Sequence, residues 1–236
     1  LYLLPFRDHV YLELRRSAEH TAPGRKFAWR FKDWAVYSAL PGAARSIAMA
    51  VPIRQLRYPL IDGLSEVAQS LMNNVLVRSG SNATEQSGRF QSLGSRHRFS
   101  YCTWAFPAAS FGNVALSYKL FCKEHYARTG FRCDMPTIGF RLNQDRSSLL
   151  SPSFDAPMIT LSPLSTQLEG WDDFVFDFAE FAAEHRGVPF FNQTRNATAE
   201  LVNARFGKRL AFFNKVRGEL DPHDRMLNQF FATYLL

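Results

Sequence analysis

Cysteine is scarce in this chain, with only three residues among 236. So small and odd a number, Cys102, Cys122 and Cys133, argues against a disulfide framework and favours buried thiols or a reducing compartment. Long apolar runs are missing too. No stretch approaches the ~20 residues needed to cross a bilayer, and no signal peptide is visible. We therefore expect a soluble protein without a membrane span, and the sequence does not assign its compartment.

The common signatures of catalytic and nucleotide-binding sites are also absent. The chain has no Gly-x-Ser-x-Gly elbow, no His-Glu-x-x-His pair, no Walker loop and no glycine fingerprint of a nucleotide-binding sheet. Cys122-x-x-His125 with Cys133 and Asp134 offers zinc-type ligands. The spacing is poor, because the first two fall inside a predicted helix, where a core thiol and a flanking histidine are the simpler interpretation. We expect no metal site.

Positive charge exceeds negative charge by seven, yet the basic residues are scattered rather than collected in runs. The densest groups, Arg205-Lys208-Arg209 and Arg96-Arg98, are short. This favours a solvated basic face over a surface for nucleic acid or anionic membrane, so we expect no nucleic-acid partner. Because the first residue is Leu1 rather than Met, we expect the chain to start inside a longer product.

Phenylalanine is plentiful, at 22 residues, about twice its average usage, so most rings must form a core while some can line a pocket. Residues 27–39 are aromatic-rich and begin with alternating apolar and polar side chains, which predicts a half-buried strand. Apolar residues then recur at helical spacing from Leu64 to Val75, with Asp62 as the predicted N-cap. Residues 79–96 predict a long surface loop.

The second half of the chain alternates strands and helices irregularly, without internal repeats. The pattern predicts strands at 99–103, 137–142, 158–161 and 188–191, helices at 107–130 and 171–185, and short helices from 197 to the end, broken at Gly207 and at 220–222. This order predicts an α+β fold with an antiparallel sheet, helices packed mainly on one face, and a C-terminal helical segment at 197–236.

Short motifs follow one another in order from residue 99 to the end. They are Phe106-Pro107, Pro136-Thr-Ile-Gly-Phe-Arg141, Asp145, Leu150-Ser-Pro152, Met158-Ile-Thr, Gly187-Val-Pro-Phe-Phe-Asn192, Leu220-Asp-Pro222 and Met226-Leu-Asn228. This succession resembles the C-terminal half of the FAD-linked oxidases of the vanillyl-alcohol oxidase superfamily. It resembles in particular the aldonolactone and alditol oxidases and the flavin-dependent cholesterol (sterol) oxidases. The resemblance covers residues 99–236 well and residues 1–98 in outline.

The resemblance implies that residues 1–236 form the substrate-binding (cap) domain of a flavoenzyme. An N-terminal FAD-binding domain, absent from this chain, would hold most of the FAD. The present part would cover the isoalloxazine ring and shape the substrate pocket. The implied reaction is oxidation of an alcohol by hydride transfer to the flavin, and the implied partners are a small-molecule alcohol and the FAD-binding domain.

The resemblance also implies roles for three residues. Arg141 falls on the family's arginine at the flavin face, where a permanent charge can stabilise negative charge on the substrate oxygen or the reduced flavin. Without the resemblance, Arg141 is equally well explained as a strand arginine that pairs with a surface carboxylate. Asn192 would be the second catalytic residue, holding the substrate hydroxyl. Asn228 would contact the cofactor and orient the pocket.

Three departures from the family pattern bear on the substrate. Gly139 stands where the family often has Glu, so a carboxylate base is missing there. Gln193 and Arg195 align with a family Lys and His, so polar partners suited to a sugar are missing. This favours a bulky apolar alcohol such as a sterol. A strand at 188–192 would place Phe190 and Asn192 on one face, as a hydroxyl-bearing apolar substrate requires. The pocket walls are expected to be Trp104, Phe140, Phe190 and Phe191.

Two other functions fit the same sequence. The first is a sugar-lactone or alditol oxidase domain, as in the rest of the family. The second is a catalytically silent α+β scaffold or binding domain, since the missing polar groups remove expected chemistry.

Overall fold

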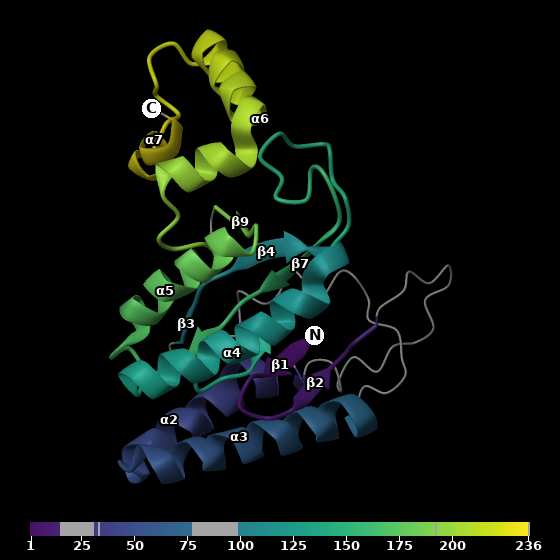
Figure 1. Cartoon of the computed structure of the whole chain (residues 1–236), viewed down its shortest axis with the longest axis vertical. Coiled ribbons are helices and arrows are strands. Elements are labelled where there is room, and N and C mark those ends of the chain that lie inside the picture. Colours follow the sequence, from purple (N-terminus) through teal and green to yellow (C-terminus); the bar gives the residue numbers. More distant parts are fainter. Residues whose placement is uncertain (15–30, 33, 77–98, 192, 236) are drawn as a thin grey trace. The chain divides into compact units, whose positions relative to one another are not determined.

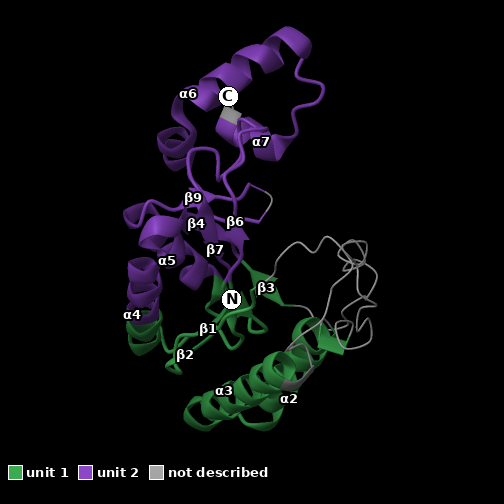
Figure 2. Ribbon diagram, turned by 90° about the vertical axis from the view of Figure 1, so that its right-hand side faces the viewer, with its two compact units in different colours: residues 1–101, 122–138, 163–171 green, residues 102–121, 139–162, 172–236 purple. Residues whose placement is uncertain are grey.

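The computed structural model describes residues 1–14, 31–32, 34–76, 99–191 and 193–235. They divide into two compact units (Figure 2). Unit 1 comprises Leu1–Tyr101, Cys122–Ile138 and Pro163–Trp171, and unit 2 comprises Cys102–Phe121, Gly139–Ser162 and Asp172–Leu236. Neither unit is one continuous segment, so both depend on contacts between distant parts of the sequence.

Unit 1 contains short antiparallel strands that join its distant segments. β1 (Tyr2–Leu4) pairs on one side with β2 (His9–Tyr11) and on the other with β5 (Thr137–Ile138), in the order β2-β1-β5. A second pair is formed by β3 (Ser100–Tyr101) and β8 (Leu164–Ser165). All of β1 is buried, as expected for a strand with neighbours on both sides.

The helices of unit 1 pack on one apolar core. The π-helix η1 (Ala35–Ala39) leads into α2 (Leu40–Ala50), and α3 (Arg54–Leu71) runs into the π-helix η2 (Met72–Leu76). The helices α2 and α3 lie side by side (Figure 1). Their buried side chains share the core with those of the strands: Tyr2, Ala35, Val36, Leu40, Ala44, Ile61, Met72, Met135, Ile138 and Leu164.

Buried charges in unit 1 are paired. Arg132 is 5% exposed; it forms an ion pair with Asp62 of α3, and its guanidinium lies 4.5 Å from the ring centroid of Tyr58. Asp134, 3% exposed, accepts hydrogen bonds from the backbone N–H of Thr166 at 2.8 Å and from the Thr166 hydroxyl. An unpaired buried charge costs several kcal/mol, so these contacts fix the segment before β5 to α3 and to the residues after β8.

Unit 2 contains a four-stranded antiparallel sheet in the order β6-β7-β4-β9. The strands are β4 (Trp104–Pro107), β6 (Arg141–Leu142), β7 (Met158–Leu161) and β9 (Val188–Pro189). β4 has partners on both sides, and its first three residues have no exposed surface. Pro189 lacks an N–H and lies on an edge strand, where a sheet tolerates proline.

An aromatic layer from two helices packs on this sheet. The ring of Phe106 in β4 lies 6.1 Å from that of Phe181 in α5 (Trp171–Glu184). Tyr118 belongs to α4 (Phe111–Thr129), which follows the 3-10 turn η4 (Ala108–Ser110), and its ring lies 5.6 Å from that of Phe178 in α5. Figure 1 shows α4 and α5 running side by side in front of β4 and β7. Gly130, with a φ of 71°, ends α4 in the left-handed conformation that glycine favours.

The C-terminal part of unit 2 is helical. α6 (Ala199–Leu220) begins after Thr198, whose side-chain oxygen accepts the N–H of Leu201 at 3.2 Å. Gly207 interrupts α6 with φ 47° and ψ −125°, so two helical pieces meet at a kink. α7 (Gln229–Leu235) then packs against α6. The core between them is centred on Val202, Phe206 and Leu210.

The predicted α+β class, with antiparallel sheets and C-terminal helices, is confirmed. The predicted helices at 107–130 and 171–185 correspond to α4 and α5, and the predicted strand at 158–161 is β7. The predicted break at Gly207 is the kink in α6, and the break at 220–222 follows its last residue. The predicted loop at 79–96 lies outside the described residues.

Two predictions in the first half are wrong. In the predicted strand at 27–39, residues 31–32 and 34–39 are helical, because the alanine-rich sequence that continues to Ala50 favours a helix and overrides the local aromatic preference for strands. Asp62 is not an N-cap. α3 already begins at Arg54 and continues through Pro59 in its interior, so Asp62 lies within the helix.

Two strand predictions in the second half are only partly right. The segment 137–142 divides at Gly139–Phe140 into β5 and β6, which join different sheets. The segment 188–191 is extended only in β9, at Val188–Pro189. Both differences arise because the pairing partner of a strand, and not its own sequence, decides where hydrogen bonding starts and stops.

The kink in α6 predicts opposite effects for two glycine substitutions. Gly207→Ala should lower the free energy of unfolding by about 1–3 kcal/mol, because a Cβ disfavours the observed positive φ. The control Gly218→Ala, at an exposed helical position with open space around the new methyl, should raise it by about 0.5–1 kcal/mol. Urea unfolding of both variants measures this. A Gly207→Ala protein as stable as the control would show that α6 can straighten without cost.

Candidate functional site

Arg141 lies on β6, at an edge of the unit 2 sheet. Its side chain is exposed, and no described residue forms a hydrogen bond or ion pair with it. The pairing with a surface carboxylate that its sequence position also allowed is thus not found in the described part of the chain. An exposed guanidinium in this state keeps five N–H donors available for a ligand.

Thr160 of β7 fixes the backbone next to Arg141. The Thr160 side-chain oxygen accepts the N–H of Phe140 at 2.9 Å, and the Thr160 backbone N–H donates to the Phe140 carbonyl at 2.8 Å. Thr160 is 3% exposed, so water does not compete with these bonds. Both backbone groups of Phe140 are therefore held, and the start of β6 has a defined position.

The strand register places Arg141 and Phe140 on opposite faces of the sheet. Arg141 is paired with Ile159, which is paired with Phe106, and directly paired residues share a face. Phe106 packs on α5, so Arg141 lies on the same face of the sheet as Phe106, the face on which α5 packs. Phe140, 56% exposed, precedes it and points to the other face. One ligand can contact both side chains only by spanning the edge of the sheet.

A tight turn follows β9 in place of the predicted strand. The backbone N–H groups of Gln193 and Thr194 both donate to the carbonyl of Phe190, at 2.7 and 2.8 Å. The strand alternation that was expected to align Phe190 with Asn192 therefore does not apply. Asn192 itself lies outside the described residues.

Thr194 attaches this turn to the start of β4. Its hydroxyl accepts the N–H of Phe190 at 2.6 Å and donates to the carbonyl of Thr103. The Thr103 N–H donates to the carbonyl of Gln193 at 3.0 Å, and the Thr103 hydroxyl pairs with that of Ser162 at 2.8 Å. All three hydroxyl-bearing residues are buried. The turn is thus fixed by hydrogen bonds that are shielded from solvent.

Cys102 extends this attachment by one residue. Its Sγ accepts the backbone N–H of Arg195 at 3.4 Å, and the thiol lies 4.0 Å from the Arg195 carbonyl as a weak donor. Burial raises the pKa of the Cys102 thiol to about 11, so the group is protonated at neutral pH and is no nucleophile. The Arg195 guanidinium is exposed and lies 3.9 Å from the carboxylate of Asp172. Cys102 therefore has a structural role rather than a catalytic one.

The predicted aromatic pocket walls have different environments. Trp104 is fully buried in β4. Phe191 stacks on Phe206 with ring centroids 5.0 Å apart and belongs to the core of α6 and α7. Phe190 is half-buried, and Phe140 is the most exposed of the four. Among the predicted walls, Trp104 has no accessible surface, Phe140 and Phe190 keep accessible surface for a ligand, and Phe191 is half-buried with its ring stacked on Phe206.

Two C-terminal motifs have side chains that bind backbone N–H groups. The Asn228 side-chain oxygen accepts the N–H of Phe231 at 2.9 Å and so caps the N-terminus of α7. The carboxylate of Asp221, which follows α6, accepts the N–H groups of Arg225 and Met226 at 3.0 and 2.8 Å and so holds the turn between α6 and α7. These hydrogen bonds give both residues a structural role independent of any cofactor.

Arg209 has a structural role that was not predicted from the sequence. Its guanidinium donates to the carbonyl oxygens of Leu149 and Ser151 at 2.9 and 3.2 Å, and so fastens the Leu-Ser-Pro turn to α6. One helical turn earlier, Arg205 donates to the carbonyl of Ala183 at 2.7 Å. The sequence analysis interpreted Arg205, Lys208 and Arg209 as a solvated basic face, which is wrong for Arg205 and Arg209. Their four-residue spacing, next to the buried positions of α6, was the sequence signal for a structural role.

A small recess in unit 1 contains other polar groups. Asp62, Ser65, Cys133 and Asp134 are among its lining residues, and its free volume of about 10 Å³ suits one water molecule. None of the predicted site residues lines it. Within the described ranges, no three His, Cys, Asp or Glu residues are grouped to bind a metal, and every helix is too short or too polar to cross a bilayer.

Comparison with known families gives a match over most of the chain. The family model of D-arabinono-1,4-lactone oxidase matches residues 48–234. This range runs from the end of α2 into α7 and contains every residue considered above for the unit 2 site. No curated protein matches the chain significantly.

The attachment of the 190–194 turn predicts how two Thr194 variants differ. Thr194→Val keeps the side-chain shape but leaves the Phe190 N–H and the Thr103 carbonyl without their buried partner, at ~1–3 kcal/mol each. Its free energy of unfolding should fall by that sum, whereas Thr194→Ser should lose about 1 kcal/mol for one methyl. Urea unfolding compares the two. Equal stability of the variants would show that the hydroxyl does not hold the turn.

Proposed function

The chain belongs to the D-arabinono-1,4-lactone oxidase family, and we propose that it is the substrate-side part of an FAD-dependent oxidoreductase acting on a sugar lactone or an alditol. The family match supports this substrate class better than the sterol expected from the sequence. That expectation rested on Gly139, Gln193 and Arg195, three positions that lack the family's usual side chains. Their absence leaves fewer hydrogen-bonding groups for a sugar, but it does not by itself create a sterol site.

Arg141 carries the proposal. It is a permanent cation that no described residue neutralises, on a strand whose start is fixed by the buried Thr160. Such a group fits a flavoenzyme, because negative charge develops on the ring system as it is reduced. When bound, FAD would supply the hydride acceptor. Arg141 would stabilise the negative charge at the substrate oxygen or at the adjoining edge of the ring system.

The turn after β9 would supply the substrate contact. Asn192, proposed to hold the reacting hydroxyl, is followed by Gln193, whose carbonyl is bound to Thr103. An amide can donate and accept but cannot serve as a strong base, so Asn192 would orient the hydroxyl rather than remove its proton. Phe140 and Phe190 would form the accessible apolar walls.

Asn228 would contribute on the cofactor side. Its side-chain oxygen is occupied by the cap of α7, which leaves its amide N–H groups as the atoms able to meet a ligand. The dinucleotide end of FAD is proposed to bind a separate domain, because the chain has no glycine fingerprint for a diphosphate. Together these roles assign alcohol oxidation to the complete enzyme and substrate recognition to this chain.

Substitution of Arg141 tests its catalytic role. In the complete flavoenzyme, Arg141→Ala should slow flavin reduction by about two to three decades, the usual effect of removing one preorganised donor, and Arg141→Lys should recover part of it. The exposed Arg146→Ala is a control with the same charge change. Stopped-flow absorbance measures the rate. An unchanged rate in Arg141→Ala would exclude the residue from the site. A wild-type protein that reduces no flavin would favour the catalytically silent scaffold.

A substrate panel tests the proposed class. We expect kcat/KM of the complete enzyme to be highest for an aldono-1,4-lactone or an alditol and lower for a sterol, measured by steady-state oxygen consumption or dye reduction. The exposed ring of Phe140 is the one feature that favours the sterol. A clear advantage for the sterol would therefore reverse the assignment, and Phe140→Ala should then reduce that advantage.

A further inference from the structure

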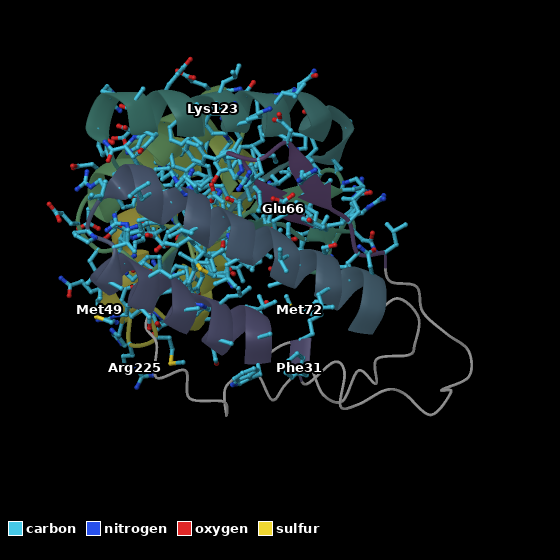
Figure 3. All side chains as sticks on the ribbon, turned by 90° about the horizontal axis from the view of Figure 1, so that it is seen from below. Phe31, Met49, Glu66, Met72, Lys123 and Arg225 are labelled. Atoms are coloured by element: carbon cyan, nitrogen blue, oxygen red, sulfur yellow. The ribbon has the colours of Figure 1, made fainter. Side chains whose placement is uncertain are left out.

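Helix α3 carries an apolar stripe on its exposed side. Six large aliphatic residues, spaced three or four apart, are exposed by 38% to 66%: Ile53, Leu56, Leu60, Leu64, Val67 and Leu71. Ile53, Leu60 and Val67 recur at seven-residue intervals, which lines them up along one side of a helix as in a coiled coil. Figure 3 looks onto α2 and α3, with Glu66 of α3 and Met72, the first residue of η2, labelled.

The arrangement of α3 departs from that of an ordinary surface helix. Its buried residues are Arg57, Tyr58, Ile61, Ser65 and Gln69, so three of the five are polar or charged, while the six aliphatic side chains of the stripe face outward. A helix on a soluble protein normally turns its apolar stripe to the core and its polar residues to water. A contiguous exposed patch of several hundred Å² marks an interaction site. The stripe therefore indicates a partner that covers it.

The chemistry of the stripe restricts that partner. From residue 55 to residue 71, no exposed position of α3 is charged, and the half-buried Asp62 and Glu66 are ion-paired with Arg132 and with Arg7. A helix that binds lipid needs Lys or Arg beside its apolar face, and a charged partner needs complementary charge. Because the stripe is apolar and neutral, it suits neither a lipid surface nor a charged partner. It can pack on an identical stripe without repulsion.

We propose that α3 is the interface of a homodimer, in which the α3 helices of two copies pack antiparallel about a twofold axis near residues 62–63. The spacing of the stripe is self-complementary in this direction. The axis places Ile53 opposite the partner's Leu71, and Leu60 opposite the partner's Leu64. Isologous pairing of one patch with itself is the commonest form of protein oligomer.

The area of the stripe supplies most of what such an interface needs. Six aliphatic side chains that bury on the order of 100 Å² each approach the ~800 Å² per partner of a specific interface. Met49, 74% exposed near the end of α2 and close in sequence to Ile53, extends the patch. Dimerisation is independent of the proposed chemistry, because no residue assigned to the unit 2 site belongs to α3.

Sedimentation velocity on the full chain at micromolar concentration tests the dimer. The wild-type protein should sediment with twice the 27.0 kDa mass of one chain. Leu60→Glu with Val67→Glu should give a monomer, with the dimer dissociation constant raised at least about 100-fold by four desolvated charges. The control pair Leu116→Glu and Leu120→Glu lies on α4, is exposed to a similar degree, and should leave the dimer intact.

A charge exchange tests the register. Leu60→Lys and Leu64→Glu should each weaken the dimer, and an equimolar mixture should restore it, since antiparallel packing pairs the new lysine with the new glutamate. A monomeric wild type would overturn the proposal, as would wild type that sediments with anionic vesicles while the Leu60→Glu, Val67→Glu variant does not. Loss of helical circular dichroism in that variant would equally overturn it, because the stripe would then be part of an internal core.

Discussion

Unit 2 depends on the hydrogen bonding of β4 and of the two residues that precede it. β4 is the strand with partners on both sides, and its Phe106 begins the aromatic layer that joins the sheet to α5. Just before it, Thr103 binds the turn at 190–194 through both of its backbone polar groups. Buried backbone groups must find partners, so the position of this turn follows from the position of β4.

The motifs that carried the family resemblance have mainly structural roles. Asn228 caps α7, Asp221 holds the turn that follows α6, and the Leu-Ser-Pro turn is held by Arg209. Arg141, which we propose acts at the flavin, is exposed and forms no hydrogen bond or ion pair with a described residue. The buried Thr160 holds the backbone of the preceding residue, Phe140, and so fixes the start of the strand on which Arg141 lies.

Periodic segments were predicted well, and pairings between segments were not. α4, α5 and β7 are long or regular enough for their own residues to specify them. The helical state of residues 34–39 depends on the helix that follows and on a core built from distant strands. Thr194 gave no local signal, since it acts on a carbonyl far away in the sequence, and the spacing of Arg209 pointed to a role beside the helix core but not to the distant carbonyls that it binds.

The sequence by itself determined the α+β class, the main helices, the breaks at Gly207 and after Leu220, and the family. Only the tertiary structure decided which face of each helix or strand packs against the protein and which face is exposed. It put Arg141 and Phe140 on opposite sides of a sheet, moved Phe191 into a core, and turned the aliphatic side of α3 outward. A residue pattern shows that a helix or strand has two faces. Which face meets the protein depends on the register and packing of distant segments, and no local pattern contains that information.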